Sequence, residues 1–195
     1  KILEAIKKLE KKGAKVSKIS LKYTDAAIPA YYIIALSEAS TNLAKFCGMR
    51  QGLQEEFKGN FNEYFSRIRS QGFGREAKRR ILLGTFARMA GFKEEYYIKA
   101  LKVKTLVVKD FQEAFKKVDV IMAPTMPTIA PKFSEIEKLK PIDCYKADAL
   151  TAPVSLAELP HLSVPAGFVN KMPVGLHLIS NYFEEGKLIQ VGDAF

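Results

Sequence analysis

The sequence predicts an α/β protein, in which helices cover a mixed β-sheet. Three observations favour this class. Amphipathic helical patterns, with lysine and glutamate on the polar side, dominate the chain before residue 118. Residues 118–125 form a short apolar run that ends near a proline, which is typical of a buried strand. Two further apolar runs, 162–169 and 173–179, flank the polar pair Asn170 and Lys171, as expected of two buried strands joined by a tight turn.

The N-terminal part predicts a helix, a strand and a second helix. Residues 1–12 carry one apolar helical stripe, and Gly13 suits a helix C-cap. The stripe consists of Ile2, Leu3, Ile6 and Leu9. Residues 16–23 predict a short strand, and Pro29 predicts the start of a helix over residues 30–46. The centre of that helix, LSEASTN, is unusually rich in small polar residues, which compete with the backbone for hydrogen bonds.

The middle of the chain predicts helices separated by loops. Residues 48–72 read as a loop that carries a short helix near Phe61–Arg69, and a helix follows at 74–90. A long helix is expected over 93–117. Its apolar stripe is Tyr97, Ala100, Val103, Val107, Phe111, Ala114 and Val118. Residues 126–146 predict a loop, after which a short helix leads into the apolar stretch, and the chain ends in a helical pattern.

The stretch 150–180 is almost free of charge and is interrupted by prolines. The prolines are Pro153, Pro160, Pro165 and Pro173. Because proline cannot donate to a strand ladder, the strands must begin late or lie beside bulges and edges. An apolar segment of this kind suits the floor of a buried site, where loops leave the ends of strands.

Composition bounds the class of protein. The 195 residues are 48% hydrophobic, which suffices for one substantial core over residues 1–195. No run approaches the roughly 18 uncharged apolar residues that a membrane helix needs. Cys47 and Cys144 belong to no CxxC pair, so we expect no metal site and free thiols of a cytoplasmic protein. Since the sequence opens on Lys1 and closes inside a helical pattern, we expect a fragment of a longer domain.

The net charge of +10 leaves two interpretations open. A basic chain suits an anionic partner such as RNA. Lysines interleaved with glutamates along helices are equally typical of an ordinary solvated surface.

The chemistry-bearing residues do not form a complete active site. No serine lies in a GxSxG motif, and no glycine-rich phosphate loop is present. Neither His161 nor His177 has an acidic residue at a spacing that indicates a catalytic triad. Arg80 offers a planar fork for a carboxylate, and Asp148 offers a partner for an ammonium group. Because a free amino acid carries one carboxylate and one ammonium group, these two side chains are the minimal set that binds both of its ends. Tyr31 and Tyr32 offer hydroxyl groups near the start of a predicted helix. Surface ion pairs are the alternative that spacing alone favours.

Several segments resemble the amidase signature family when taken in chain order. They are PAYYIIALSEASTNLAKF, GFGREAKRRILLGTF, VDVIMAPTMPTIAP, LTAPVSLAELPHLSVPAGF and MPVGLHLI. The resemblance implies a mixed sheet covered by helices, and a serine nucleophile assisted by a cis-serine and a lysine that belong to an N-terminal portion. No such stretch occurs here, so no catalytic residue is assigned. The family motifs imply that Tyr31 contacts the substrate, that Arg80 holds its carboxylate and that Asp148 holds its amino group.

Two of these segments contain the spaced motifs YYIIA–SEAS–NL and FG–E–KRRI–LGT. These motifs resemble those of the glutamine-hydrolysing subunits of tRNA-dependent amidotransferases. This resemblance implies glutamine as substrate and a cytoplasmic heterotrimer that includes a small C-type subunit together with a tRNA-binding B-type subunit. It assigns tRNA, ATP and Mg²⁺ mainly to the partner, with no cofactor, metal or membrane contact in this chain. A tRNA-independent small-amide hydrolase of the same family and a basic, non-catalytic RNA-binding module are the alternatives. Glu158 and Cys47 stand where the family usually has glycine and aspartate.

Overall fold

The computed structural model describes residues 1–195, except for the side chain of Pro141. The chain divides into two compact units. Unit 1 comprises Lys1–Tyr31 and Val103–Phe195, and unit 2 comprises Tyr32–Lys102. Two long helices, α2 (Thr24–Asn42) and α5 (Lys99–Phe115), contribute residues to both.

Unit 1 contains the sheet and most of the helices. Its other elements are α1 (Ile2–Lys11), β1 (Val120–Pro124), α6 (Phe133–Ile136), α7 (Pro141–Lys146), η3 (Ala147–Leu150), α8 (Ala152–Leu156), β2 (His161–Val169), β3 (Met172–Ser180) and α9 (Glu185–Ala194). The remaining elements of unit 2 are η1 (Leu43–Lys45), α3 (Phe61–Gly72), α4 (Arg75–Arg88) and the π-helical turn η2 (Glu94–Ile98). The α/β class is therefore confirmed.

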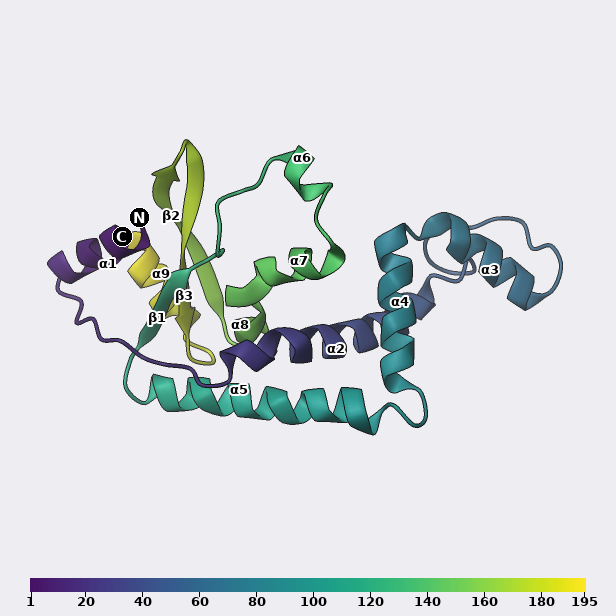
Figure 1. Ribbon diagram of the computed structural model, residues 1–195, viewed down its shortest axis with the longest axis horizontal. Coiled ribbons are helices and arrows are strands. Elements are labelled where there is room, and N and C mark those ends of the chain that lie inside the picture. The colour runs from purple at the N-terminus through teal and green to yellow at the C-terminus, as the bar shows by residue number, and fades with distance from the viewer. The chain divides into compact units, whose positions relative to one another are not determined.

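The sheet has the strand order β1–β3–β2, and both pairings are antiparallel (Figure 1). Asn170 and Lys171 form the predicted tight turn, and both have positive φ, 49° and 64°. Two positive φ values are the signature of a type I′ hairpin turn, whose twist matches that of the strands. The pairing register shifts between Pro165 and Phe168, so the proline lies beside a bulge of an edge strand, as predicted.

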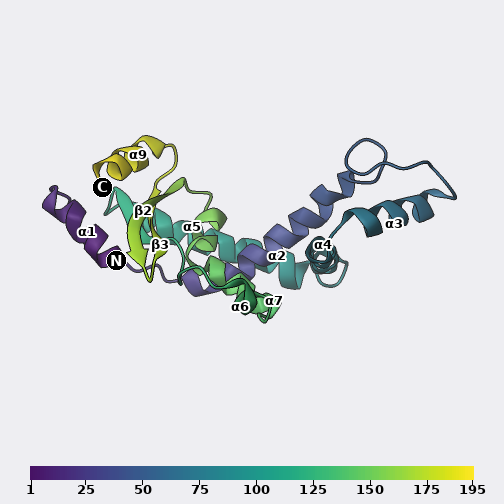
Figure 2. The same ribbon diagram turned by 90° about the horizontal axis from the view of Figure 1, so that it is seen from above.

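The core of unit 1 lies on one face of the central strand β3. Leu176 and Leu178 are fully buried there. They pack with three side chains from the two terminal helices, which lie near the sheet in both views (Figures 1 and 2). Those side chains are Ala5 and Leu9 of α1 and Leu188 of α9. The prediction of two buried strands is confirmed only for the second half of β3, residues 176–180. No residue of β2 is buried: its residues alternate between exposed and half-buried as far as Gly167, and its last two residues are exposed.

Three local predictions were wrong. Residues 16–23 form no strand, and the side chains of Val16 and Tyr23 are each 40% exposed, since no neighbouring strand pairs with this segment. Helix α2 begins at Thr24 and contains Pro29, because burial of Ala27 and Ala30 favours the earlier start. Leu3 is 75% exposed, and Ala5 takes its place against the sheet.

The loop predicted at 126–146 also differs, since it carries two short helices, α6 and α7, which its mixed composition did not indicate. The helix predicted at residues 61–69 agrees more closely. The short helix predicted in the 48–72 loop is α3, and it begins with a capping box: Glu63 N–H donates to Asn60 Oδ1 at 3.0 Å, and Asn60 N–H to Glu63 Oε2 at 3.4 Å. Among the described residues, no helix is long and apolar enough to cross a membrane.

Helices α2 and α4 make a very close backbone contact within unit 2. At Gly84 of α4, the backbone of Leu36 and Ser37 leaves no space for a side chain. The small polar centre of α2 serves this contact: Ser37 is fully buried, and its Oγ donates to Ile33 O at 2.6 Å along its own helix. The hydroxyl is thereby satisfied without a bulky neighbour.

Candidate functional site

The three predicted substrate-binding residues lie on three helices. Tyr31 is on α2 and Asp148 on η3, both in unit 1, and Arg80 is on α4, in unit 2. All three are half-buried. Their convergence on one ligand stays a prediction.

Arg80 is positioned by a carboxylate one turn earlier in α4. Its Nε donates to Glu76 Oε1 at 3.0 Å, while Arg79 Nη1 donates to Glu76 Oε2 at 2.5 Å. Glu76 thus divides its two oxygens between adjacent arginines. The side chains of Arg79 and Arg80 are 30% and 43% exposed, so the two pairs contribute little to stability. Their effect is to fix the direction in which the side chain of Arg80 extends from the helix.

Asp148 lies immediately before the buried helix α8. Its carbonyl oxygen accepts a hydrogen bond from Thr151 N–H at 3.1 Å, which closes the turn into that helix. The side chains of Ala152, Val154 and Leu156 are at most 4% exposed, so the backbone that carries Asp148 is anchored by burial. That residues 150–180 form the floor of a binding site stays a prediction.

Glu158 occupies a backbone conformation that suits glycine. It follows the end of α8 with φ of 60°. Glu158 N–H donates to Ser155 O at 3.1 Å and Leu159 N–H to Val154 O at 3.3 Å, which is the Schellman arrangement. The residue at this position is usually glycine, because a side chain is strained there. The carboxylate of Glu158 pairs with Lys104 Nζ of α5.

A pair of histidines spans β2 and β3 on the face opposite the Leu176–Leu178 core. His177 Nε2 lies 2.9 Å from His161 Nδ1, and the rings meet edge-on. His177 is 1% exposed, and its Nδ1 has no hydrogen-bond partner among the described residues. Burial first, and then the nearby His161, lower the pKa of His177 to about 4. His177 is therefore neutral at physiological pH and stays a structural feature.

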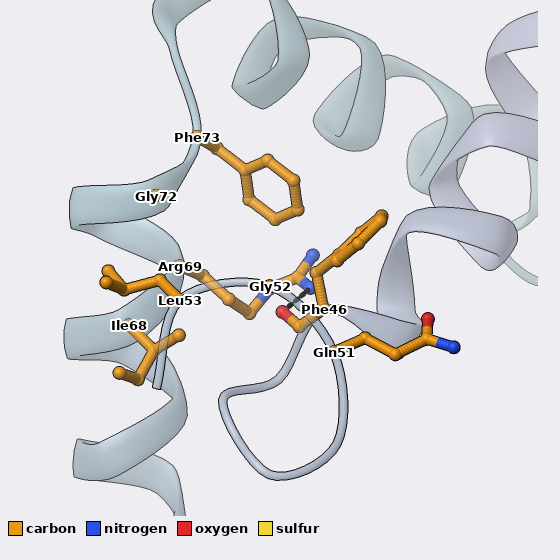
Figure 3. A pocket seen from close by; sticks show the side chains of 8 residues that line it. All are labelled: Phe46, Gln51, Gly52, Leu53, Ile68, Arg69, Gly72 and Phe73. Atoms are coloured by element: carbon orange, nitrogen blue, oxygen red, sulfur yellow. Dashed lines mark hydrogen bonds between the residues drawn. The ribbon is translucent and has the colours of Figure 1, made fainter. Parts of the chain in front are cut away.

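An apolar cavity of about 230 Å³ lies in unit 2 between α3 and the loop before it (Figure 3). Arg69 Nη1 donates to Leu43 O at 2.9 Å and to Phe46 O at 3.3 Å, and its guanidinium lies 4.8 Å from the centre of the Phe73 ring. These contacts satisfy carbonyl groups at the end of η1. Arg69 therefore has a structural role.

No cluster of three or more histidine, cysteine, aspartate or glutamate side chains within the described part of the chain could hold a metal ion. Both cysteines are free thiols.

The comparisons with known proteins identify the family. The family model described as amidase matches residues 1–189. The chain therefore belongs to the amidase family. It is 50% identical over all 195 residues to the A-type subunit of glutamyl-tRNA(Gln) amidotransferase from Lacticaseibacillus casei, and 48% identical over 189 residues to the A-type subunit from Archaeoglobus fulgidus. It spans 40% and 41% of those two proteins.

Solved structures support the same fold. The crystal structure of the A-type subunit of glutamyl-tRNA(Gln) amidotransferase from Thermotoga maritima matches with a TM-score of 0.71 and 35% identity, over 99% of this chain and 37% of that one. A 6-aminohexanoate cyclic dimer hydrolase matches with a TM-score of 0.70 at 14% identity, over 99% of this chain and 39% of that one, which shows the fold alone.

Sequence reasoning missed the contact between Ser40 of α2 and Arg88 of α4. Arg88 Nη2 donates to Ser40 Oγ at 2.9 Å, across 48 positions of the sequence. No spacing rule joins residues so far apart. The small residues of LSEASTN and Gly84 were the available signal, since small faces permit close helix packing.

Proposed function

We propose that the chain is the glutamine-binding C-terminal portion of the A-type subunit of a glutamyl-tRNA(Gln) amidotransferase. The observation that carries the proposal is the 50% identity to the Lacticaseibacillus casei protein along the whole chain. The 35% identity to the Thermotoga maritima protein, at a TM-score of 0.71, supports it from the structural side. A tRNA-independent amidase is the less favoured function, because the amidase and the cyclic dimer hydrolase structures match at only 21% and 14% identity.

The proposed role of the chain is to hold glutamine by its two charged ends. The planar guanidinium of Arg80 binds the α-carboxylate through paired hydrogen bonds, and the carboxylate of Asp148 binds the α-ammonium group. Tyr31 adds a hydroxyl at the same ligand. With both ends held, the side-chain amide is presented in one orientation to a nucleophile, and such positioning lowers the entropic part of the barrier.

The bond-breaking groups of the proposed enzyme lie outside these 195 residues. A serine nucleophile, a cis-serine and a lysine of the preceding portion release ammonia. The ammonia passes to a tRNA-binding B-type subunit that activates glutamate on tRNA with ATP and Mg²⁺, in a cytoplasmic complex that also contains a small C-type subunit. On this proposal the isolated chain has no glutaminase activity, and turnover by the purified chain would contradict it.

The test is glutaminase kinetics of the assembled enzyme that contains this chain. We expect Arg80→Ala to lower kcat/KM for glutamine by a factor of about 30 to 5,000, which corresponds to loss of a desolvated charge pair worth about 2–5 kcal/mol. Arg79→Ala is the matched control, since it removes the neighbouring arginine from the same carboxylate of Glu76. Equal effects of the two substitutions would refute the assignment of Arg80.

A further inference from the structure

Unit 2 contains a polar cavity of about 290 Å³. Its lining residues are Ser37, Glu38 and Thr41 of α2, Arg88 of α4, and Lys93 and Tyr97 around η2. None of Tyr31, Arg80 and Asp148 lines it. The proposed glutamine site therefore does not account for this cavity.

The close contact between α2 and α4 creates one wall of the cavity. Because Gly84 lies against the backbone of Leu36, Arg88, one turn later in α4, comes within reach of Ser40, one turn later in α2. Ser40 is 7% exposed and its Oγ donates to Ser37 O at 2.7 Å, so its lone pairs are oriented to accept from Arg88 Nη2. One of the five N–H groups of the guanidinium is used in this anchor.

The charges in the cavity are not balanced. Among the described residues, none of the ion pairs joins a carboxylate to Arg88 or Lys93. Glu38, which is exposed, supplies the single carboxylate of the lining. Two cations held near each other by separate elements attract an anion into the space between them.

We propose that this cavity binds a hydrogen phosphate group, either free or as a phosphomonoester. Arg88 supplies a planar fork for two phosphate oxygens and Lys93 a compact positive charge. The hydroxyl of Tyr97 is a further donor, whereas that of Thr41 donates to Ser37 O at 3.4 Å. Glu38 selects the ligand: near neutral pH a phosphate group with a pKa of about 6–7 is partly protonated, and its P–OH donates to the carboxylate. Sulfate carries no such proton and is repelled.

The size of the cavity agrees with a ligand larger than the anion alone. A volume of about 290 Å³ is close to the lower end of the usual range for small-molecule sites. It accommodates a phosphate group and the first atoms of an ester substituent.

The test is calorimetric titration of the intact protein that contains this chain with inorganic phosphate, glycerol phosphate, sulfate and a short RNA. We expect phosphate or the phosphomonoester to bind, and Arg88→Gln and Lys93→Gln each to weaken binding by at least about tenfold. Lys99→Gln is the matched control, since this exposed lysine follows η2 but does not line the cavity. Thermal unfolding of each variant verifies that it is folded.

Selectivity gives a second readout that a purely structural role would not change. We expect Glu38→Gln to bring the affinity for sulfate to within a few-fold of that for phosphate. Absence of binding at about 10 mM phosphate, equal binding of sulfate by the unmodified protein, or affinities unchanged in the Arg88 and Lys93 variants would each overturn the proposal. Tighter binding of RNA than of either phosphate, lost in the same variants, would also overturn it. Glutaminase kinetics are a separate measurement, so failure here does not affect the proposed function.

Discussion

Gly84 of α4 lies so close to Leu36 of α2 that a Cβ at position 84 would overlap the carbonyl oxygen of Leu36. It would also be 2.9 Å from the backbone nitrogen of Ser37. Since both obstacles are backbone atoms, no side-chain rotation relieves the contact. This pair of residues sets the separation of two helices of unit 2, and with it the position of Arg88 beside Ser40.

We therefore expect Gly84→Ala to destabilise the protein, by about 3 kcal/mol, through overpacking. Helix propensity alone would give the opposite sign, because alanine is favoured over glycine in a helix by about 1 kcal/mol. Gly186→Ala in α9 is the control: nothing lies within 4 Å of its Cβ position, so that variant should be neutral or stabilised. Chemical denaturation measures both free energies of unfolding. A stabilised Gly84→Ala variant would contradict the close contact.

Glu158→Gly should stabilise the protein. It removes strain of about 1–2 kcal/mol at a φ of 60°, against an entropic cost of about 0.5–1 kcal/mol for glycine in the unfolded chain. Loss of the partly exposed pair with Lys104 costs about 0–1 kcal/mol, so the middle of these ranges gives a net gain of about 0.3 kcal/mol. Glu158→Gln keeps the backbone strain but loses the charge, and should be neutral or slightly destabilised. Thermal or chemical unfolding measures the stability of both variants. If Glu158→Gly is no more stable than Glu158→Gln, the strain argument is refuted.

The pH dependence of the free energy of unfolding should reflect the protonation of His177. Its pKa is about 4 in the folded protein and near 6.5 when unfolded, so the unfolded state binds more protons between these values. Stability is therefore fully present above about pH 6.5 and falls as the pH is lowered, by about 2 kcal/mol between pH 7 and pH 5. The lowered pKa values of the exposed Glu4 and Glu113 act only near and below their ordinary value of 4.5, outside this window.

Two glutamine variants isolate the effect of His177. Because burial is its main cause, His177→Gln should remove most of the loss between pH 7 and pH 5, whereas His161→Gln should retain most of it. Urea denaturation at a series of pH values gives the comparison. An unchanged slope in His177→Gln would show that another group titrates in this range.

The sequence predicted the hairpin correctly because its signals are local. The two apolar runs, the Asn170–Lys171 pair and the positions of Pro165 and Pro173 all lie within the two strands and their turn. The strand expected at 16–23 was predicted from Val16, Ile19, Leu21 and Tyr23, but strand formation requires a neighbouring strand, which no local pattern supplies. Element type was therefore predictable where the partner strand was adjacent in sequence.

Site residues follow the same rule. Charge complementarity nominated Arg80 and Asp148 only weakly, and family resemblance supplied their roles. The cavity around Arg88 and Lys93 was missed, because its walls come from helices almost fifty positions apart and depend on the absence of a side chain at Gly84. Close backbone packing of this kind can be recognised only when both helices are placed.

The last prediction concerns an exposed apolar face of α4. Leu82, Phe86 and Met89 lie at helical spacing and are 71%, 41% and 50% exposed. On the proposed function, the preceding portion of the same protein or a partner protein covers this face. We therefore expect the purified 195-residue chain to self-associate, with a mass by light scattering that rises with concentration.

Leu82→Lys should shift the equilibrium towards the monomer. Ile189→Lys in α9 adds the same charge at a residue that is 67% exposed, and therefore controls for the net charge of the chain. A monodisperse monomer of the unmodified chain, or equal effects of the two substitutions, would show that this face of α4 does not drive association.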